Sequence, residues 1–330
     1  MQNGYLSQAT EKRMMLFSGD GYPELSERIA DRLDIPLDGV DLQQFSGGEV
    51  YARYLDSVRG ADVFIIQSLC EPVNTNLMQL LVMIDAAKRA SAKRITAVIP
   101  WYAYSRQDRK TKPREPITAR LVASMIRTAG AERVMTMDLH VGQIEGFFSF
   151  PVDHLTAMHA FVDHFVEMGF REAEDAVVVA PDTGEAKVAK RLADHLGLPW
   201  AILNKMRRGP GESEVTHVIG DVEGRRVIII DDLIDTAGTL CNAAERLLDE
   251  GATEVYAAGT HPVFSGPAYE RLEASQIKEV LVTDTLPLKE GEPQSKIRTL
   301  TIAPILASTI RNVFTDDSVS EVFMGENQLF

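Results

Sequence analysis

Apolar residues in this chain follow two patterns, which alternate along its length. In one pattern several apolar residues stand side by side, as in the Val-Ile-Ile-Ile run at 227–230. Such uninterrupted β-branched runs are typical of strands that are buried on both faces of a sheet. In the other pattern apolar residues recur every three or four positions, as at 23–33 and 239–250, which predicts amphipathic helices.

Together the two patterns predict an α/β fold with parallel sheets flanked by helices. Because strand-like runs alternate with helix-like segments, neighbouring strands are connected through helices, and such connections give parallel pairing. Strands are predicted at 14–17, 63–67, 95–99, 134–137, 177–180, 227–230, 255–258 and 279–282. Helices are predicted at 23–33, 76–90, 117–128, 185–196 and 239–250.

A short internal repeat indicates that the chain contains two similar units. The sequence GAERV at 130–134 leads to His140, and GATEV at 251–255 leads to His261 at the same offset. Duplication of one α/β unit explains the repeat. Two independent solutions to the same helix-to-strand turn would give the same pattern, so both explanations stay open.

The size of the chain agrees with a two-domain organisation. Its 330 residues, 45% of them hydrophobic, are enough to form two cores. We predict one domain at 1–155 and a second at 156–310. The tail, residues 311–330, is predicted to pack on the first domain.

The net charge of −14 limits the partners of the chain. An acidic protein is a poor general binder of nucleic acid or anionic membrane, and we expect neither as a partner. No apolar run reaches the ~18 residues of a membrane span, and the polar start lacks the core of a signal peptide. Cys70 and Cys241 are too few for a disulfide framework, so we expect a cytoplasmic protein. The basic clusters at 105–114 and 205–208 indicate small polyanionic ligands.

The strongest candidate site follows the apolar run at 227–230. An acidic loop leads there into the start of a helix, and its residues are Asp231, Asp232, Asp235, Thr236, Ala237, Gly238 and Thr239. Backbone amides at 235–239 can converge on a phosphate, helped by the helix N-terminus. The two threonine hydroxyls add donors, and the aspartates can accept from sugar hydroxyls or balance a magnesium-bound diphosphate. The alternative is an Asp-rich turn with a Thr cap.

This loop resembles the phosphoribosyl diphosphate loop that phosphoribosyltransferases share with ribose-phosphate diphosphokinases. The segment 100–110 separates the two families, because it resembles an ATP-binding segment that the transferases lack. The resemblance implies that Arg106, Gln107 and Asp108 contact ATP. It also implies two similar phosphoribosyltransferase-like domains.

A second segment, 45–49, resembles the companion ATP segment of the diphosphokinases. The resemblance implies that Phe45 stacks on adenine and that Glu49 accepts a hydrogen bond from the adenine amino group. Taken alone, Phe45 would be a core residue and Glu49 a surface acid. Gly47, which we also include in the ATP site, stands where Asp or Asn is usual in the family.

Two strand ends carry candidate metal ligands. The resemblance places a magnesium–ATP ligand at His140 and a second metal ligand at Asp182, which implies Mg²⁺ as the cofactor. Magnesium prefers oxygen, so His140 could instead act through water or phosphate, or be a satisfied structural histidine. Asp182 could also cap the following helix, and both of its roles can hold.

The segment 204–207 resembles the mobile catalytic loop of the family. The resemblance implies that Lys205 and Arg207 are catalytic, with Arg207 also contacting ribose 5-phosphate. Two cations there can neutralise charge on the transferred diphosphate. A solvated basic loop is the alternative. Among departures from the usual pattern, Ser149 replaces a frequent acid and Glu185 a frequent Gly.

The chain is therefore identified as resembling the ribose-phosphate diphosphokinases nearly from end to end. The resemblance implies transfer of the β,γ-diphosphoryl group of ATP to the C1 hydroxyl of ribose 5-phosphate, giving phosphoribosyl diphosphate and AMP for nucleotide biosynthesis. It also implies a hexamer, with phosphate and ADP as possible regulators near residues 318–320. The alternatives are a phosphoribosyltransferase and a non-catalytic regulatory homologue.

Overall fold

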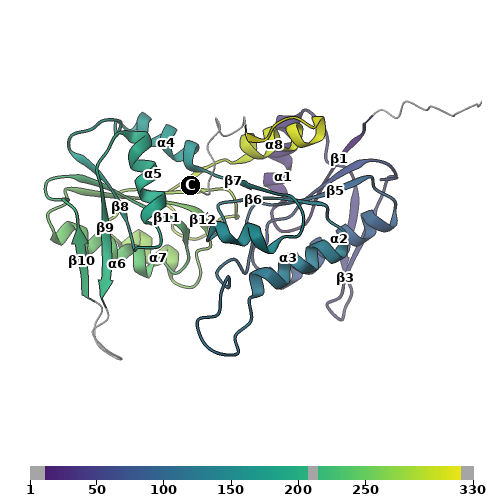
Figure 1. The fold of residues 1–330 in the computed structure, drawn as a ribbon, viewed down its shortest axis with the longest axis horizontal. Helices are drawn as coiled ribbons and strands as arrows, with labels where there is room; N and C mark the ends of the chain where they lie inside the picture. The colour runs from purple at the N-terminus through teal and green to yellow at the C-terminus, as the bar shows by residue number, and fades with distance from the viewer. Residues whose placement is uncertain (1–11, 207–214, 321–330) are drawn as a thin grey trace, which may run out of the picture.

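The structure, a computed structural model, describes residues 12–206 and 215–320 of the chain. Two α/β units lie side by side along the long axis of the molecule, as Figure 1 shows, and each contains a sheet with helices on both faces. Among the described residues, no helix is long and apolar enough to cross a membrane.

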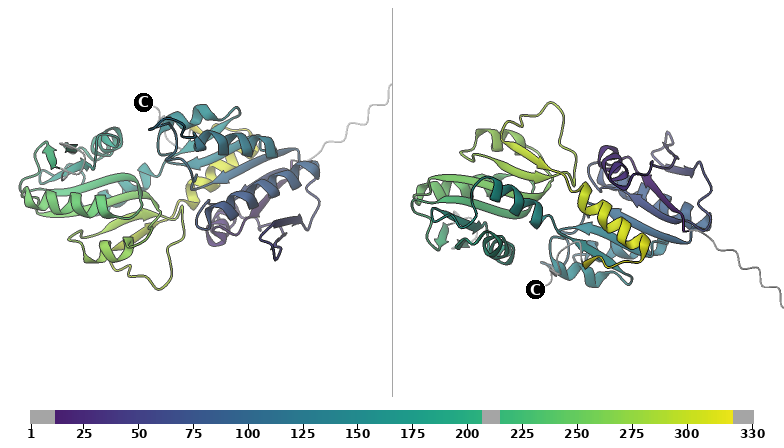
Figure 2. Two further views of the ribbon diagram at one scale, coloured as in Figure 1. Left: turned by 90° about the horizontal axis from the view of Figure 1, so that it is seen from below. Right: turned by 90° about the horizontal axis from the view of Figure 1, so that it is seen from above.

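The first unit contains a five-stranded parallel sheet with the order β1-β4-β5-β6-β7. Its strands are β1 (Met14–Ser18), β4 (Asp62–Ile66), β5 (Arg94–Ile99), β6 (Arg133–Met137) and β7 (Val152–Leu155). A separate antiparallel hairpin, β2 (Val40–Gln44) with β3 (Val50–Tyr54), stands beside it. The hairpin lies at the end of the first unit that is remote from the second sheet in Figures 1 and 2.

The second unit contains a seven-stranded sheet with the order β10-β9-β8-β11-β12-β13-β14. All its strand pairs are parallel except β10 with β9, which is antiparallel. Its strands are β8 (Ala176–Ala180), β9 (Trp200–Met206), β10 (Val215–Ile219), β11 (Arg226–Ile234), β12 (Glu254–Pro262), β13 (Val280–Thr283) and β14 (Ile297–Leu300). The predicted parallel sheets flanked by helices are confirmed.

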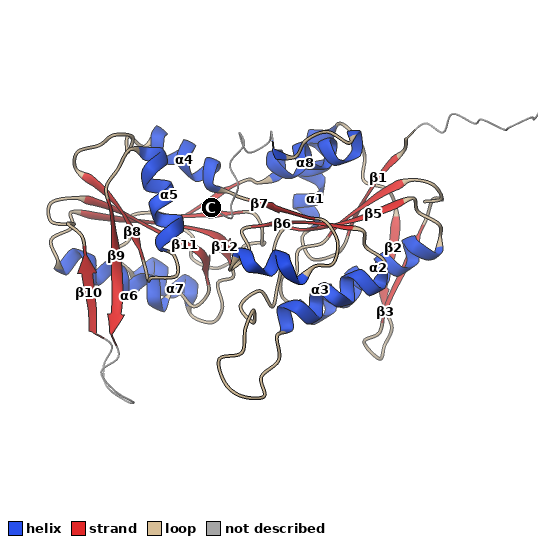
Figure 3. Ribbon diagram, in the orientation of Figure 1, coloured by secondary structure: helices blue, strands red, loops and turns tan. Residues whose placement is uncertain are grey.

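Helices pack on both faces of each sheet, as Figure 3 shows. Their bounds are α1 (Pro23–Leu33), α2 (Val73–Arg89), α3 (Thr118–Ala129), α4 (Met158–Glu167), α5 (Ala186–Leu196), α6 (Gly238–Asp249), α7 (Ala268–Ala274) and α8 (Ala303–Thr315), with a 3-10 helix at Gly142–Phe147. One continuous cluster of buried apolar residues includes Phe64 of the first sheet, Phe161 of α4 and Ile228 of the second sheet. The two units therefore share part of their core.

The last helix, α8, returns to the first unit. It packs beside α1, and the Arg311 guanidinium donates to the Arg32 carbonyl at 3.2 Å. Asp316, at the C-terminal end of α8, forms ion pairs with Arg94 and Lys12. These contacts place the residues that follow the second sheet against the first unit.

The largest departure from the sequence prediction concerns β11. Its apolar run predicts a strand ending at 230, but the strand continues through Asp231 and Asp232 to Ile234. The extension pairs with β12, with Asp231 opposite Gly259 and Ile234 opposite Pro262. Because this pairing is a tertiary contact, the local sequence could not indicate it.

Candidate functional site

The end of β11 projects beyond one of its two neighbouring strands. β8 pairs with β11 only from Arg226 to Ile229, whereas β12 stays paired with it as far as Ile234. Asp231 and Asp232 therefore lie on a strand with one edge free. In open α/β sheets, ligands bind outside the carboxyl ends of such strands.

A tight turn of three residues, Asp235, Thr236 and Ala237, connects β11 to α6. Ala237 has a φ of 57°, in the left-handed region, and α6 starts at the next residue, Gly238. A Cβ at Gly238 would lie 3.2 Å from Nη1 of Arg271, which itself donates to the Thr236 carbonyl at 2.9 Å. Arg271 therefore braces the turn. The first amides of α6, which have no intrahelical acceptor, remain available to an anion.

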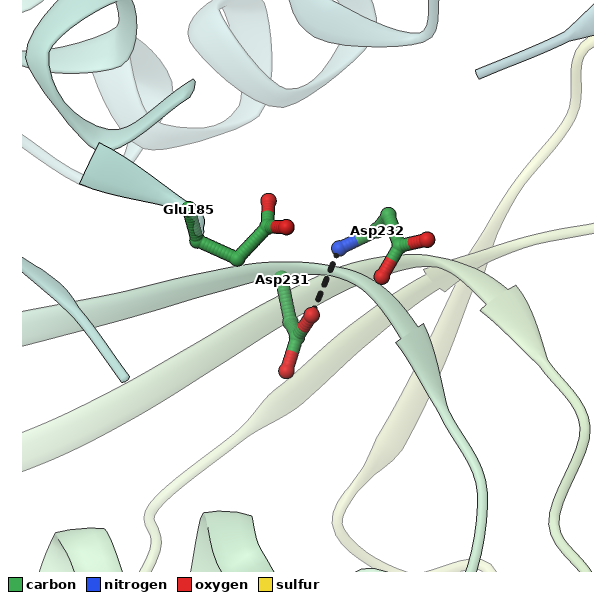
Figure 4. Close-up of side chains that lie close together, drawn as sticks. All are labelled: Glu185, Asp231 and Asp232. Atoms are coloured by element: carbon green, nitrogen blue, oxygen red, sulfur yellow. Dashed lines mark hydrogen bonds between the residues drawn. The ribbon is translucent and has the colours of Figure 1, made fainter. Parts of the chain in front are cut away.

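Three carboxylates, those of Asp231, Asp232 and Glu185, gather at the free edge of β11. One oxygen of each lies within 4.8 Å of the others, and the Glu185 side chain extends over β11 toward the two aspartates (Figure 4). Burial, followed by the charges of these aspartates and of Asp182, raises the pKa of Glu185 to about 9. Burial and the neighbouring Asp232 also raise the pKa of Asp231 well above its usual value. The cluster therefore favours binding of a proton or a cation.

His140 joins this cluster from the other unit, where it follows β6. Its Nδ1 lies 2.7 Å from Oδ2 of Asp232, which is only 8% exposed. The hydrogen bond to Asp232 raises the pKa of His140, opposed by burial and supported by the charges of Glu185 and Asp108. Burial alone would raise the pKa of Asp232, but the His140 partner lowers it. His140 and Asp232 thus form a hydrogen-bonded pair that joins the two units.

Asp182 lies in the turn before α5, next to the carboxylate cluster. Its Oδ1 accepts hydrogen bonds from the amides of Gly184 at 2.8 Å and Glu185 at 3.4 Å. Asp182 thus holds the turn before the helix and is not the N-cap of α5, which is Glu185. The turn uses one carboxylate oxygen and leaves Oδ2 for a ligand.

The predicted ATP segment reaches the turn after β11 through an ion pair. Arg106, in the loop between β5 and α3, donates to Oδ2 of Asp235. Burial alone would raise the pKa of Asp235, but hydrogen bonds from Ser265 and Arg106 lower it. Gln107 is held in the same loop, because its Oε1 accepts from the Thr118 hydroxyl at the start of α3. The structure therefore brings Arg106 to the turn between β11 and α6, where the sequence predicts a phosphate site.

Comparisons with known proteins identify the family. Residues 14–130 match the N-terminal domain of ribose phosphate pyrophosphokinase, and residues 207–324 match the phosphoribosyl synthetase-associated domain. A ribose-phosphate pyrophosphokinase of Clostridium perfringens is 50% identical over 312 residues, which cover 94% of this chain and 98% of the relative. The chain belongs to the ribose-phosphate pyrophosphokinase family.

Further matches agree with this family and its fold. A ribose-phosphate pyrophosphokinase of Caldanaerobacter subterraneus is 51% identical over 310 residues, which cover 94% of this chain and 98% of the relative. The crystal structure of phosphoribosylpyrophosphate synthetase from Mycobacterium smegmatis matches with a TM-score of 0.88 and 46% identity, covering 92% of this chain and all of that one. The predicted family and fold class are confirmed.

Phe45, Gly47 and Glu49, the other ATP residues that the family resemblance implies, are not brought to this site within one chain. They lie at the tip of the β2–β3 hairpin, which stands at the far end of the first unit (Figure 1). The Phe45 side chain is 53% exposed, and its ring centroid lies 5.9 Å from that of Tyr51. A Cβ at Gly47 would meet nothing within 4 Å. The tip is therefore an exposed surface in the single chain.

The two residues predicted to be catalytic lie at the edge of the described part of the chain. The Lys205 backbone belongs to β9 and pairs with Thr216 of β10. The Lys205 side chain and all of Arg207 lie outside the described residues. Of the predicted regulatory segment 318–320, Ser318 accepts a hydrogen bond from the Asn312 side chain through its carbonyl.

Three residues of the site were missed by sequence reasoning. Glu185 was noted only as a departure from the usual pattern, although an acid beside Asp182 was an available signal. Arg271 and the buried His261 lie far from the motifs in sequence and reach the site only through tertiary contacts. His261 had one sequence signal, because the internal repeat aligns it with His140.

Proposed function

We propose that this chain is a ribose-phosphate diphosphokinase. It transfers the β,γ-diphosphoryl group of ATP to the C1 hydroxyl of ribose 5-phosphate, giving phosphoribosyl diphosphate and AMP. The observation that carries the proposal is the contact between the ATP segment and the phosphate-binding turn. Arg106 of the first unit pairs with Asp235 of the second, so a nucleotide and a sugar phosphate would meet between them.

Ribose 5-phosphate would bind at the carboxyl end of β11. Its phosphate would accept hydrogen bonds from backbone amides at 235–239 and from the Thr236 and Thr239 hydroxyls, at the positive end of α6. Asp231 and Asp232 would accept hydrogen bonds from the ribose hydroxyls. The free edge of β11, where β8 no longer pairs, gives the sugar room to reach both carboxylates.

ATP would bind across two copies of the chain. Arg106 contacts Asp235 in the turn after β11, whereas the β2–β3 hairpin, whose tip carries Phe45, stands at the far end of the first unit (Figure 1). We therefore propose that the hairpin of a neighbouring subunit supplies the adenine contacts. A hexamer built from dimers would place each hairpin against another chain, with ADP and phosphate as regulators near 318–320.

Mg²⁺ fits the charges at the site. The oxygens of Asp231, Asp232 and Glu185 lie together, and burial and mutual repulsion raise the pKa of Glu185 to about 9, which a bound cation would reverse. Asp182 and His140 border this cluster and would hold the ion directly or through water. When bound, Mg²⁺ neutralises negative charge on the ATP phosphates.

The chemical step needs positioning and positive charge more than covalent catalysis. The C1 hydroxyl attacks the β-phosphorus in line, the bond between the α-phosphate's bridging oxygen and the β-phosphorus breaks, and AMP leaves. Lys205 and Arg207 would stabilise the charge that develops on the transferred diphosphate. The hydrogen bond to Asp232 raises the pKa of His140, so His140 would add a positive charge when it is protonated.

We also propose that residues 1–155 and 156–310 are separate domains and that residues 311–330 pack on the first. The support is the contact of Arg311 with the Arg32 carbonyl and of Asp316 with Arg94. Helix α8 starts at Ala303, so part of the second range also lies against α1.

Product analysis tests the activity directly. Phosphorus NMR of the purified chain with ATP, ribose 5-phosphate, Mg²⁺ and phosphate should show AMP and phosphoribosyl diphosphate in equal amounts. Omitting ribose 5-phosphate should abolish AMP formation. A phosphoribosyltransferase would instead consume phosphoribosyl diphosphate with a nucleobase, and a non-catalytic homologue would form no product. Release of ADP in place of AMP would contradict the proposal.

A further inference from the structure

His261 is buried where the two units meet. It lies near the end of β12 and pairs with Leu233, the residue after Asp232 on β11. Its side chain is 0% exposed, and its ring centroid lies 4.5 Å from that of Trp101 at the start of the ATP segment. One imidazole from the second unit therefore packs against the segment of the first unit that precedes Arg106.

Both ring nitrogens of His261 have partners. Nε2 lies 3.0 Å from the carbonyl of Asp138, and Nδ1 lies 2.9 Å from the hydroxyl of Thr285. A carbonyl oxygen can only accept, so Nε2 carries the proton in this contact. Burial lowers the pKa of His261, which favours the neutral ring, and Nδ1 of that ring faces the Thr285 hydroxyl, which also lies 3.1 Å from the Thr260 carbonyl. The tautomer is thereby fixed, with its single N–H directed across the junction between the units.

Asp138 occupies a strained turn directly after β6. Its φ is 25°, a conformation that non-glycine residues rarely adopt, so surrounding contacts must hold it. Its carboxylate Oδ2 accepts from the Ala157 amide at 3.0 Å and from the Thr260 hydroxyl at 2.7 Å. Thr260 and His261 thus support this turn from β12, and β7 supports it from the other side, because the Asp138 amide donates to the Leu155 carbonyl at 2.9 Å and the Leu139 amide to Nε2 of His154 at 2.9 Å.

The same turn directs His140 toward the acidic end of β11. His140 stands two residues after Asp138, and its Nδ1 lies 2.7 Å from Asp232. Neighbouring strands thus hold one turn at two points: β12 holds its beginning through His261, and β11 holds its end through Asp232. A change in the first contact would alter the position of His140 relative to Asp232 and to the magnesium–ATP that His140 is proposed to hold.

We infer that His261 is a positioning residue that sets the place of His140 in the active site by donating a hydrogen bond to the Asp138 carbonyl. The inference rests on the proposed diphosphokinase activity. If His261 only filled the core, replacing it would lower the stability of the fold. It would not change the kinetic constants for ATP more than those for ribose 5-phosphate. The two roles therefore predict different kinetic results.

Two substitutions at His261 separate hydrogen bonding from packing. His261→Leu removes the donor, whereas His261→Gln keeps an N–H group near the position of Nε2. We expect His261→Leu to lower kcat/KM for ATP by on the order of tenfold, with a smaller effect on KM for ribose 5-phosphate. His261→Gln should recover most of the loss, and equilibrium ATP binding measured by calorimetry should follow the same order.

His164 supplies the matched control. It is also a buried histidine, 6% exposed, and its Nε2 lies 2.8 Å from Glu279, outside the site. His164→Leu should lower the melting temperature and leave kcat/KM for ATP unchanged within about twofold. If His261→Leu gives this same result, His261 is only a packing residue and the inference is wrong.

A double-mutant cycle tests whether the effect passes through His140. In a His140→Ala background, His261→Leu should change kcat/KM for ATP by less than about twofold, because the group it positions is gone. If His261→Leu lowers kcat/KM for ATP by the same factor with His140 present and with His140→Ala, the inference is wrong. If the wild-type chain forms no product, the proposed activity fails instead, and ATP binding by the same variants still decides the role of His261.

Discussion

The acidic end of β11 and the tip of the β2–β3 hairpin are both predicted to bind substrate, yet they are built differently. At the end of β11, Asp232 is 8% exposed and is held by His140 from the other unit. At the hairpin tip, Phe45 is 53% exposed, and space around Gly47 is open. One region has its geometry fixed by contacts within the chain, whereas the other presents side chains to solvent.

This difference indicates which part of the site one chain can complete. Buried carboxylates keep their arrangement because neighbouring strands, α5 and His140 all contact them. The hairpin tip also lies at the end of the first unit that is remote from the second sheet (Figure 1). The difference supports the proposal that the ribose phosphate half of the site is internal to the chain and that another copy completes the adenine half.

The largest expected effect comes from Lys205, in the segment that we propose as the catalytic loop. Lys205→Ala should lower kcat by about 10²–10³-fold and leave ATP affinity nearly unchanged, because its charge acts mainly on the transition state. Steady-state kinetics with separate ATP-binding measurements check this. Lys190→Ala, at an exposed lysine paired with Asp194 on α5, is the control. Near-normal turnover of Lys205→Ala would remove the loop from the mechanism.

A smaller effect is expected at the phosphate-binding turn. Asp235→Ala should raise KM for ribose 5-phosphate by about 10–100-fold, because the turn loses a charged group and its tie to Arg106. KM for ATP should rise less, because Arg106 itself remains. Initial rates with each substrate varied in turn provide the measurement. Equal changes in both KM values would contradict the division of the substrates between the two units.

The hairpin should give an effect that depends on assembly. Phe45→Ala should raise KM for ATP about tenfold and change the free energy of unfolding by less than about 0.5 kcal/mol, because the side chain is exposed. Co-expressed Phe45→Ala and Lys205→Ala chains should form some sites in which both elements are intact. At low ATP, the activity of the co-expressed chains should therefore be higher than the sum of the activities of the two separate variants. Strictly additive activity would show that sites are not shared.

The carboxylate cluster predicts an effect of pH on stability. Because the folded-state pKa of Glu185 is raised to about 9, the folded protein holds a proton that the unfolded chain releases near its ordinary pKa of ~4.3. The free energy of unfolding contributed by Glu185 therefore falls as pH rises between these values. In the metal-free protein, the free energy of unfolding of Glu185→Gln minus that of the wild type should therefore increase as the pH is raised. We expect an increase on the order of 2–4 kcal/mol from about pH 5 to about pH 8.5.

Denaturant unfolding at the two pH values, with and without Mg²⁺, measures this effect. Mg²⁺ should stabilise the wild type more than Glu185→Gln, because the carboxylate is available to the cation. Glu49→Gln, at an exposed position in the hairpin, is the control and should change the free energy of unfolding by less than about 0.5 kcal/mol. If the free energies of unfolding of Glu185→Gln and wild type differ by the same amount at both pH values, the Glu185 carboxylate is not held protonated in the folded protein.

The sequence predicted the elements of the fold where local pattern determines them. Helix α1 has the predicted bounds, and the predicted strands 95–99 and 134–137 each begin one residue earlier in the structure. The extension of β11 through Asp231 and Asp232 was missed, because pairing with β12 imposes it. The hairpin was also missed as a structural element, because its strands are only partly buried and lack a continuous apolar run.

The site was predictable only as far as its parts lie in short motifs. The acidic loop and Arg106 are adjacent to recognisable patterns, and the structure brings them together. Glu185 and His261 could not be assigned roles, because their contacts join segments far apart in the sequence. The separation of Phe45 from the turn also follows from topology, which local patterns do not record.

A crystal structure of the chain with ribose 5-phosphate tests the central claim most directly. The account predicts density for the phosphate at the start of α6, within hydrogen-bonding distance of the amides at 235–239, and the ribose hydroxyls near Asp231 and Asp232. A sugar phosphate bound elsewhere, with this turn vacant, would contradict the account.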